Sequence, residues 1–169
     1  MQPRVAAGGG GKTPDEIAQD LCREIAARLP ASLDIEKAHQ SVFAKTATGQ
    51  PASLGVFVGQ EIDRFNTLLS VMRRTLDQLD KAIEGTVVMS MELEGVMARF
   101  LDGKVPEPWE GAGYPSLKPL ASWVNDLIAR VSFISKWLYG GFPDSYWVSA
   151  FFFPQGFMTA ALQTYARKT

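Results

Sequence analysis

The strongest constraint on the fold is a long repeat of apolar residues between Ser53 and Gly85. Its members follow one another at alternating steps of four and three: Val58, Ile62, Phe65, Leu69, Met72, Leu76, Leu79 and Ile83. A spacing that averages about 3.5 residues is typical of a helix that lies along other helices through a narrow seam. The repeat therefore predicts one long helix whose seam residues, from Phe65 to Leu76, are buried together.

Shorter helices are predicted on both sides of this one. The predicted starts are Thr13-Pro14, Asp34, Ser90, Leu117 and Pro154, and the predicted stops are Pro30, Val42, Gly103 and Gly140-Gly141. Ser, Thr and Asp cap helix starts, whereas Gly and Pro end helices. Residues 45–53 and 103–116 are predicted as loops, the second rigid and irregular. Only residues 146–153 could form a strand or a buried irregular segment, so the chain is predicted to be all-α.

A block rich in aromatic residues lies between Tyr114 and Lys168. The residues that we expect to pack or dock are Trp123, Trp137, Trp147, Phe151, Phe152, Phe153 and Phe157. An aromatic residue buries about 150 to 250 Å² when it is enclosed. The predicted helices have narrow apolar seams, and we expect these seams to pack against one another and not against the aromatic block. We therefore expect the block to be a docking surface that the molecule alone covers incompletely.

Composition excludes several classes of function. The net charge is −1 and no long basic run occurs, so nothing indicates a nucleic-acid partner. One cysteine, Cys22, and one histidine, His39, exclude a disulfide within the chain and argue against a zinc site. No triad, metal site or acid–base pair is recognisable, so we expect no catalytic residue, metal or cofactor. The cysteine content fits a reducing intracellular compartment, and the N-terminus carries no apolar signal core.

The segment from Ala6 to Thr13 offers an alternative function. It reads A-x-x-x-x-G-K-T, a relaxed phosphate-binding loop in which Gly11, Lys12 and Thr13 would hold phosphate and Mg²⁺. Such a loop follows a buried strand, and only five residues stand before it. Pro14 also removes an N–H from the first helical turn. A nucleotide-binding protein therefore stays as the alternative to a plain glycine loop before a capped helix.

Residues 146–162 are apolar apart from Ser149, Gln155 and Thr159. A membrane-spanning helix needs about 20 apolar residues and tolerates such interruptions poorly. Pro154 and Gly156 lie in the middle of the segment. We therefore predict a core or docking segment and no membrane partner.

Short signatures occur along almost the whole sequence. They are, in order, Gln2-Pro3-Arg4, Gly8 to Lys12, Leu29-Pro30, Gln60-Glu61-Ile62, Arg64-Phe65-Asn66, Met89-Ser90, Glu92-Leu93-Glu94, Lys104-Val105-Pro106, Trp109, Tyr114 to Leu120, Trp147, Phe151 to Thr159 and Tyr165-Ala166-Arg167-Lys168. With these signatures the sequence resembles the C-terminal part of a dynein heavy chain of the axonemal type, and the aromatic block is the most specific part of the resemblance.

The resemblance implies a division of the chain and a role for it. Residues 1–108 would be the helical small part of the sixth AAA+ module, which binds no nucleotide, and residues 109–169 the start of the C-terminal domain. The chain would be a fragment of an ATP-driven microtubule motor of cilia and flagella, serving as a non-catalytic structural and regulatory segment. Its partners would be the rest of the motor ring, the C-terminal domain and other axonemal dynein subunits. Its location would be the cytoskeleton of the axoneme.

Overall fold

The long apolar repeat forms the central helix of the computed structural model, which describes residues 11–45, 49 and 52–168. This helix, α2, covers Ser53–Glu84 and ends at Gly85, whose φ of 87° lies in the left-handed region that favours glycine. The seam residues buried together along it are Phe65, Leu69, Met72 and Leu76. The prediction of one long helix with this seam is confirmed.

The remaining elements are also helical. They are α1 (Pro14–Arg28), the 3₁₀ turn η2 (Ile35–Lys37), α3 (Met91–Leu101), α4 (Glu107–Ala112), α5 (Leu120–Gly140), the 3₁₀ turn η3 (Val148–Ala150) and α6 (Pro154–Lys168). Apart from an isolated bridge at Lys45, the described residues contain no β-structure. The all-α prediction is confirmed.

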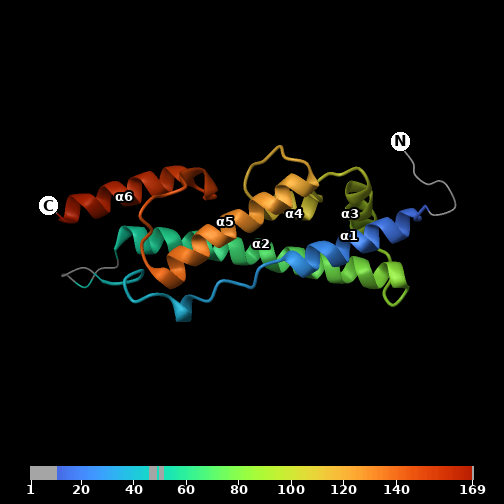
Figure 1. The fold of residues 1–169 in the computed structure, drawn as a ribbon, viewed down its shortest axis with the longest axis horizontal. Helices are drawn as coiled ribbons and strands as arrows, with labels where there is room; N and C mark the ends of the chain where they lie inside the picture. Colours follow the sequence, from blue (N-terminus) through green and yellow to red (C-terminus); the bar gives the residue numbers. More distant parts are fainter. Residues whose placement is uncertain (1–10, 46–48, 50–51, 169) are drawn as a thin grey trace.

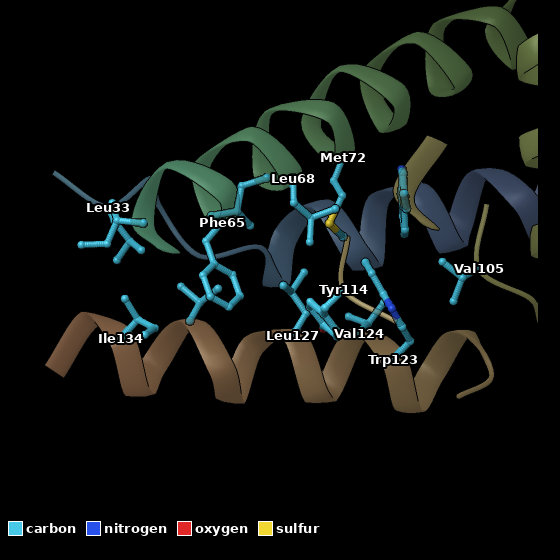
Figure 2. Packing of buried hydrophobic residues seen from close by; sticks show 14 of the residues in the cluster. Leu33, Phe65, Leu68, Met72, Val105, Tyr114, Trp123, Val124, Leu127 and Ile134 are labelled. Atoms are coloured by element: carbon cyan, nitrogen blue, oxygen red, sulfur yellow. The ribbon is translucent and has the colours of Figure 1, made fainter. Parts of the chain in front are cut away.

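The other helices surround α2 (Figure 1). Helix α1 packs on its C-terminal half, where Arg23 pairs with Asp80 and Glu84, and α6 packs on its N-terminal half. Helix α5 lies opposite α2, and the side chains between them form the core, among them Leu68 from α2 and Leu127 from α5 (Figure 2). Helices α3 and α4 cover the remaining side of α2.

Two helix starts follow the predicted capping chemistry. The Thr13 hydroxyl accepts a hydrogen bond from the Glu16 N–H at 3.1 Å, and the Glu16 carboxylate accepts one from the Thr13 N–H at 3.2 Å. This reciprocal pair is the predicted capping box of α1. At the start of α3, the Ser90 hydroxyl accepts from the Leu93 N–H at 3.2 Å. These local signals set both boundaries.

The helix predicted over residues 35–42 is wrong in length, because only the 3₁₀ turn η2 forms there. The Asp34 carboxylate accepts from the Glu36 N–H, two residues on, which closes a turn in place of a full helical turn. The His39 N–H then donates to the Leu138 carbonyl at the end of α5 instead of continuing a helix. A tertiary contact therefore ends the element early.

The loop predicted over residues 103–116 contains a helix, α4. Pro108 stands in its first turn, where a missing N–H costs nothing. Trp109 is fully buried and packs edge-on against Phe100 at 5.5 Å and stacks on Trp123 at 5.8 Å. The proline and glycine content of this segment favoured the prediction of a loop. The short helix α4 forms nevertheless, and it places Trp109 in the core.

The segment 146–153 forms no strand. It is irregular, with the 3₁₀ turn η3 in its middle and an extended Phe151 after it. The irregular form, which the sequence left open beside the strand, is therefore the one observed. Its burial is partial, since Phe151 is buried and Phe153 is exposed.

One hydrophobic core runs through both of the predicted parts, residues 1–108 and 109–169. It includes Phe65 and Met72 from the first part and Trp123 and Leu127 from the second. The division into these parts concerns their places in a longer heavy chain, and it stays a prediction.

Candidate docking surface

The seven aromatic residues predicted to pack or dock fall into a buried and an exposed group. Buried are Trp123, Trp137, Phe151 and Phe157; Phe152 is half-buried; Trp147 is 37% and Phe153 48% exposed. The molecule itself therefore covers most of the aromatic block, which corrects the expectation that its helices could not. The part left for a partner is smaller and centres on Trp147 and Phe153.

The cover comes from a second buried face of α2. Phe57 packs edge-on against Phe151 at 4.9 Å and against Phe157 at 5.8 Å, and the last two rings stack on each other at 5.0 Å. Sequence reasoning missed this face, whose buried residues Leu54, Phe57, Glu61 and Leu68 run beside the seam at helical spacings. That spacing, with Glu61 as its one charged member, was the signal that could have found it.

Glu61 anchors the turn that precedes α6. Its side chain is fully buried, and one carboxylate oxygen accepts from the Phe152 N–H at 2.6 Å. The other oxygen accepts from the Phe153 N–H at 3.2 Å and from the Arg64 guanidinium at 3.0 Å. Burial raises the pKa of the Glu61 carboxyl, and the two backbone N–H groups and Arg64 oppose that rise.

Arg130 of α5 holds the same turn at Ala150. Its guanidinium donates to the Ala150 carbonyl at 3.3 Å and to the Asp126 carboxylate at 2.7 Å. It also lies 3.6 Å from the centroid of the Tyr114 ring, a cation–π contact. That ring in turn stacks on Trp123 at 6.0 Å, and burial raises the pKa of the Tyr114 phenol. The turn is thus fixed through its backbone by charged side chains from two helices.

The exposed residues Trp147 and Phe153 have fixed positions. The Trp147 Nε1–H donates to the Ser149 hydroxyl at 2.7 Å, and its ring contacts Phe133 at 6.4 Å. The Phe153 ring lies over Gly156, where an added Cβ would meet it at 2.5 Å. Phe153 also lines a groove of about 370 Å³ between α2 and α6, with Gln60 and other polar residues beside an apolar floor. An exposed aromatic side chain at a groove, as Phe153 is, is suited to binding a protein surface.

Comparison with known proteins identifies the family. The family model for the C-terminal domain of the dynein heavy chain matches residues 1–169. The chain belongs to this family. It is 52% identical to human dynein axonemal heavy chain 6 over 168 residues, and 40% identical to rat dynein axonemal heavy chain 1 over 168 residues. Each match covers 99% of this chain and 4% of the relative.

A third relative gives the same result. Mouse dynein axonemal heavy chain 3 is 43% identical over 162 residues, which is 96% of this chain and 4% of the relative. The chain thus spans about 4% of the length of these relatives. The resemblance to axonemal dynein heavy chains, inferred from the sequence, is confirmed.

In this dynein segment, the described part of the glycine loop serves α1. The Thr13 hydroxyl is engaged in the capping box, and the Lys12 ammonium pairs with Asp20. Gly11 is exposed just before the cap, and residues 6–10 lie outside the described residues. Lys12 and Thr13 therefore have structural partners on the helix that follows them.

The sequence's one cysteine and one histidine have different surroundings. Cys22 is buried in α1, where burial raises the pKa of its thiol to about 12, and His39 is exposed with its ring beside the Ser41 hydroxyl. Within the described ranges, no three His, Cys, Asp or Glu side chains lie close enough together to hold a metal ion. In the same ranges, no helix combines the length and apolar character needed to cross a bilayer.

Proposed function

We propose that this chain is a non-catalytic structural and regulatory segment of an axonemal dynein heavy chain. The heavy chain would be part of the ATP-driven microtubule motor of cilia and flagella, and the segment would act at the axoneme. The family match over residues 1–169 supports this proposal. The segment would work by packing against the rest of the motor and by transmitting its movements.

The observation that carries the docking role is the pair of fixed, exposed aromatic side chains. The Trp147 ring is held by a hydrogen bond to Ser149, and the Phe153 ring lies against Gly156, so both side chains are restricted before a partner arrives. Preorganised side chains lose little conformational freedom on binding, which favours affinity. The proposed partners are the adjacent modules of the motor ring, further C-terminal structure and other axonemal dynein subunits.

The division of the chain belongs to the same proposal. Residues 1–108 would continue the sixth AAA+ module, and residues 109–169 would begin the C-terminal domain. Helix α2 belongs to the first part and packs against α5 and α6 of the second. Such a shared helix would pass a displacement of one part to the other.

The test uses a complete heavy chain that carries Phe153→Asp or Trp147→Ser. Docking should weaken, so limited proteolysis should cut the C-terminal region faster and microtubule gliding should change, while ATP binding is retained. Leu117→Ser is the matched control, since Leu117 is fully exposed and lies away from the groove. If both variants behave like this control, the docking role is wrong.

A further inference from the structure

Glu61 is a buried carboxylate on an otherwise apolar helix face. It lies on the second buried face of α2, between Phe57 and Leu68, and its side chain has no exposure to solvent. Burying a carboxylate is expensive unless donors surround it, and apolar replacements of buried ion pairs are often as stable or more stable. At Glu61, however, an apolar residue would leave the N–H groups of Phe152 and Phe153 without an acceptor, so the carboxylate has a specific role at the turn before α6.

The donors that satisfy Glu61 come from two sources. Arg64 is a neighbour on the same helix, whereas the N–H groups of Phe152 and Phe153 belong to the turn before α6. Arg130 has the same arrangement: Asp126 lies one turn away on α5, whereas the Ala150 carbonyl belongs to the turn. Each charged anchor thus has one permanent partner on its own helix and one partner that can leave.

This arrangement gives both charges a partner in two states. With the turn in place, all contacts are made. With the turn withdrawn, Glu61 keeps Arg64 and gains water, and Arg130 keeps Asp126 and the Tyr114 ring. Breaking a buried ion pair is normally costly because one charge is left buried and unpaired. Withdrawal of the turn leaves no charge in that situation.

Few of the described side chains of α6 are buried. Helix α6 rests on α2 mainly through Phe157 and Ala160, while Met158 and Leu162 on its other side are exposed. Before the turn, Gly141 ends α5 with a φ of 92°, a conformation that a glycine adopts freely. Elements with few buried contacts open first in native proteins.

We propose that Glu61 and Arg130 form a latch, which holds residues 150–153 in place and whose release frees α6 as a unit. Helices α1 to α5 stay packed in the released state, because α2 contacts α1, α3, α4 and α5 directly. Release uncovers Phe57 and Phe65 on the N-terminal half of α2, since Phe151 and Phe157 cover the first ring and Phe152 packs on the second at 4.7 Å. The latch does not rest on the docking role proposed above, although it holds Phe153, one of the two docking residues.

Hydrogen–deuterium exchange of the 169-residue protein tests the latch. Glu61→Gln keeps the shape of the side chain but places an amide donor against a donor, so amides of residues 152–164 should exchange about tenfold faster. Amides of α2 between residues 65 and 82 should change less than twofold. Asp63→Asn is the matched control, an exposed carboxylate on the same helix, and it should leave both regions unchanged.

Two results would overturn the latch. In the first, Glu61→Gln accelerates exchange equally in α2 and α6, which would make Glu61 an ordinary stabiliser of the whole fold. In the second, exchange at residues 152–164 does not change. The parent protein gives a further check that needs no variant: residues 152–164 should exchange as one cooperative group, faster than α2, and equal protection of both would contradict the proposal.

Discussion

Asn66 of α2 binds both backbone polar groups of Leu33. Its Oδ1 accepts from the Leu33 N–H at 2.8 Å, and its Nδ2 donates to the Leu33 carbonyl at 2.9 Å. Leu33 lies in the connection between α1 and η2, and its side chain is buried. The Asn66 amide thus provides hydrogen bonds to the Leu33 N–H and carbonyl, which have no partner in a helix or strand. These bonds fix the connection to the central helix.

Replacing this amide should destabilise the fold measurably. Asn66→Ala leaves the N–H and carbonyl of Leu33 without protein partners, so the free energy of unfolding should fall by about 1 to 3 kcal/mol in urea denaturation. Thr67→Ala is the control, because the exposed Thr67 hydroxyl bonds only to the Asp63 carbonyl of its own helix. Its change should stay within about 0.5 kcal/mol. Equal effects of the two variants would contradict the role of Asn66.

Two glycines in the first turns of α2 should respond in opposite ways to alanine. An added Cβ at Gly55 would lie 2.5 Å from the Val42 carbonyl oxygen, whereas at Gly59 the nearest atom is a Phe43 ring carbon at 3.5 Å. Gly55→Ala should therefore destabilise by about 1 to 3 kcal/mol through overpacking. Gly59→Ala should stabilise by up to about 1 kcal/mol, because alanine favours helices. If the urea midpoints of both variants shift in the same direction, the close approach of the Val42 carbonyl to Gly55 is refuted.

The buried thiol of Cys22 should make stability fall in alkaline solution. Its pKa is raised from 9.0 to about 12 in the folded protein. Between these values the unfolded thiol loses its proton while the folded thiol keeps it, so the unfolded state binds fewer protons. The free energy of unfolding then decreases as pH rises, by up to about 1.4 kcal/mol per unit from this group.

The control for this prediction is Cys22→Ala, which lacks the thiol but keeps the other groups that titrate in this range. The stability of the parent relative to the variant, measured by urea denaturation, should decline from about pH 8 to about pH 10. The folded parent should also react slowly with iodoacetamide. A constant difference between the two proteins would show that the thiol ionises normally in the folded state.

Lys12 should not serve as a phosphate ligand. Its ammonium pairs with Asp20, and the neighbouring Thr13 hydroxyl is held in the capping box of α1. Isothermal titration with Mg-ATP should give no heat of binding for the parent, for Lys12→Ala or for Asp20→Asn, which releases the lysine. Micromolar binding by the parent that disappears in Lys12→Ala would restore the nucleotide-binding alternative.

Most of the helical framework could be predicted because its signals are local. The step pattern from Val58 to Ile83 specifies α2, and the Thr13–Glu16 box specifies the start of α1. These signals depend on residues within a turn or two of each other, so a single sequence contains them. Gly85 ends α2 for the same reason, through its own backbone conformation.

The residues that the sequence left unrecognised act across long distances along the polypeptide. Glu61 and Phe152 are separated by 91 positions, and Arg130 and Ala150 by 20. The residues near Glu61 in the sequence do not indicate that its hydrogen-bond partners are backbone N–H groups of a later turn. For the same reason, the cover that α2 gives to Phe151 and Phe157 could not be counted before the packing was known.

The ladder formed by Trp109, Trp123 and Tyr114 gives this protein an internal optical reporter. The two indole rings lie 5.8 Å apart at 26°, and Tyr114 lies 6.0 Å from Trp123 at 14°. The electronic transitions of rings at such short distances and small angles couple with one another. A fixed, chiral arrangement of these rings should therefore give a near-ultraviolet circular dichroism signal. The rings come from α4, α5 and the connection between them, so this signal reports whether those elements are packed together. Acrylamide, in contrast, should quench the fluorescence of the exposed Trp147.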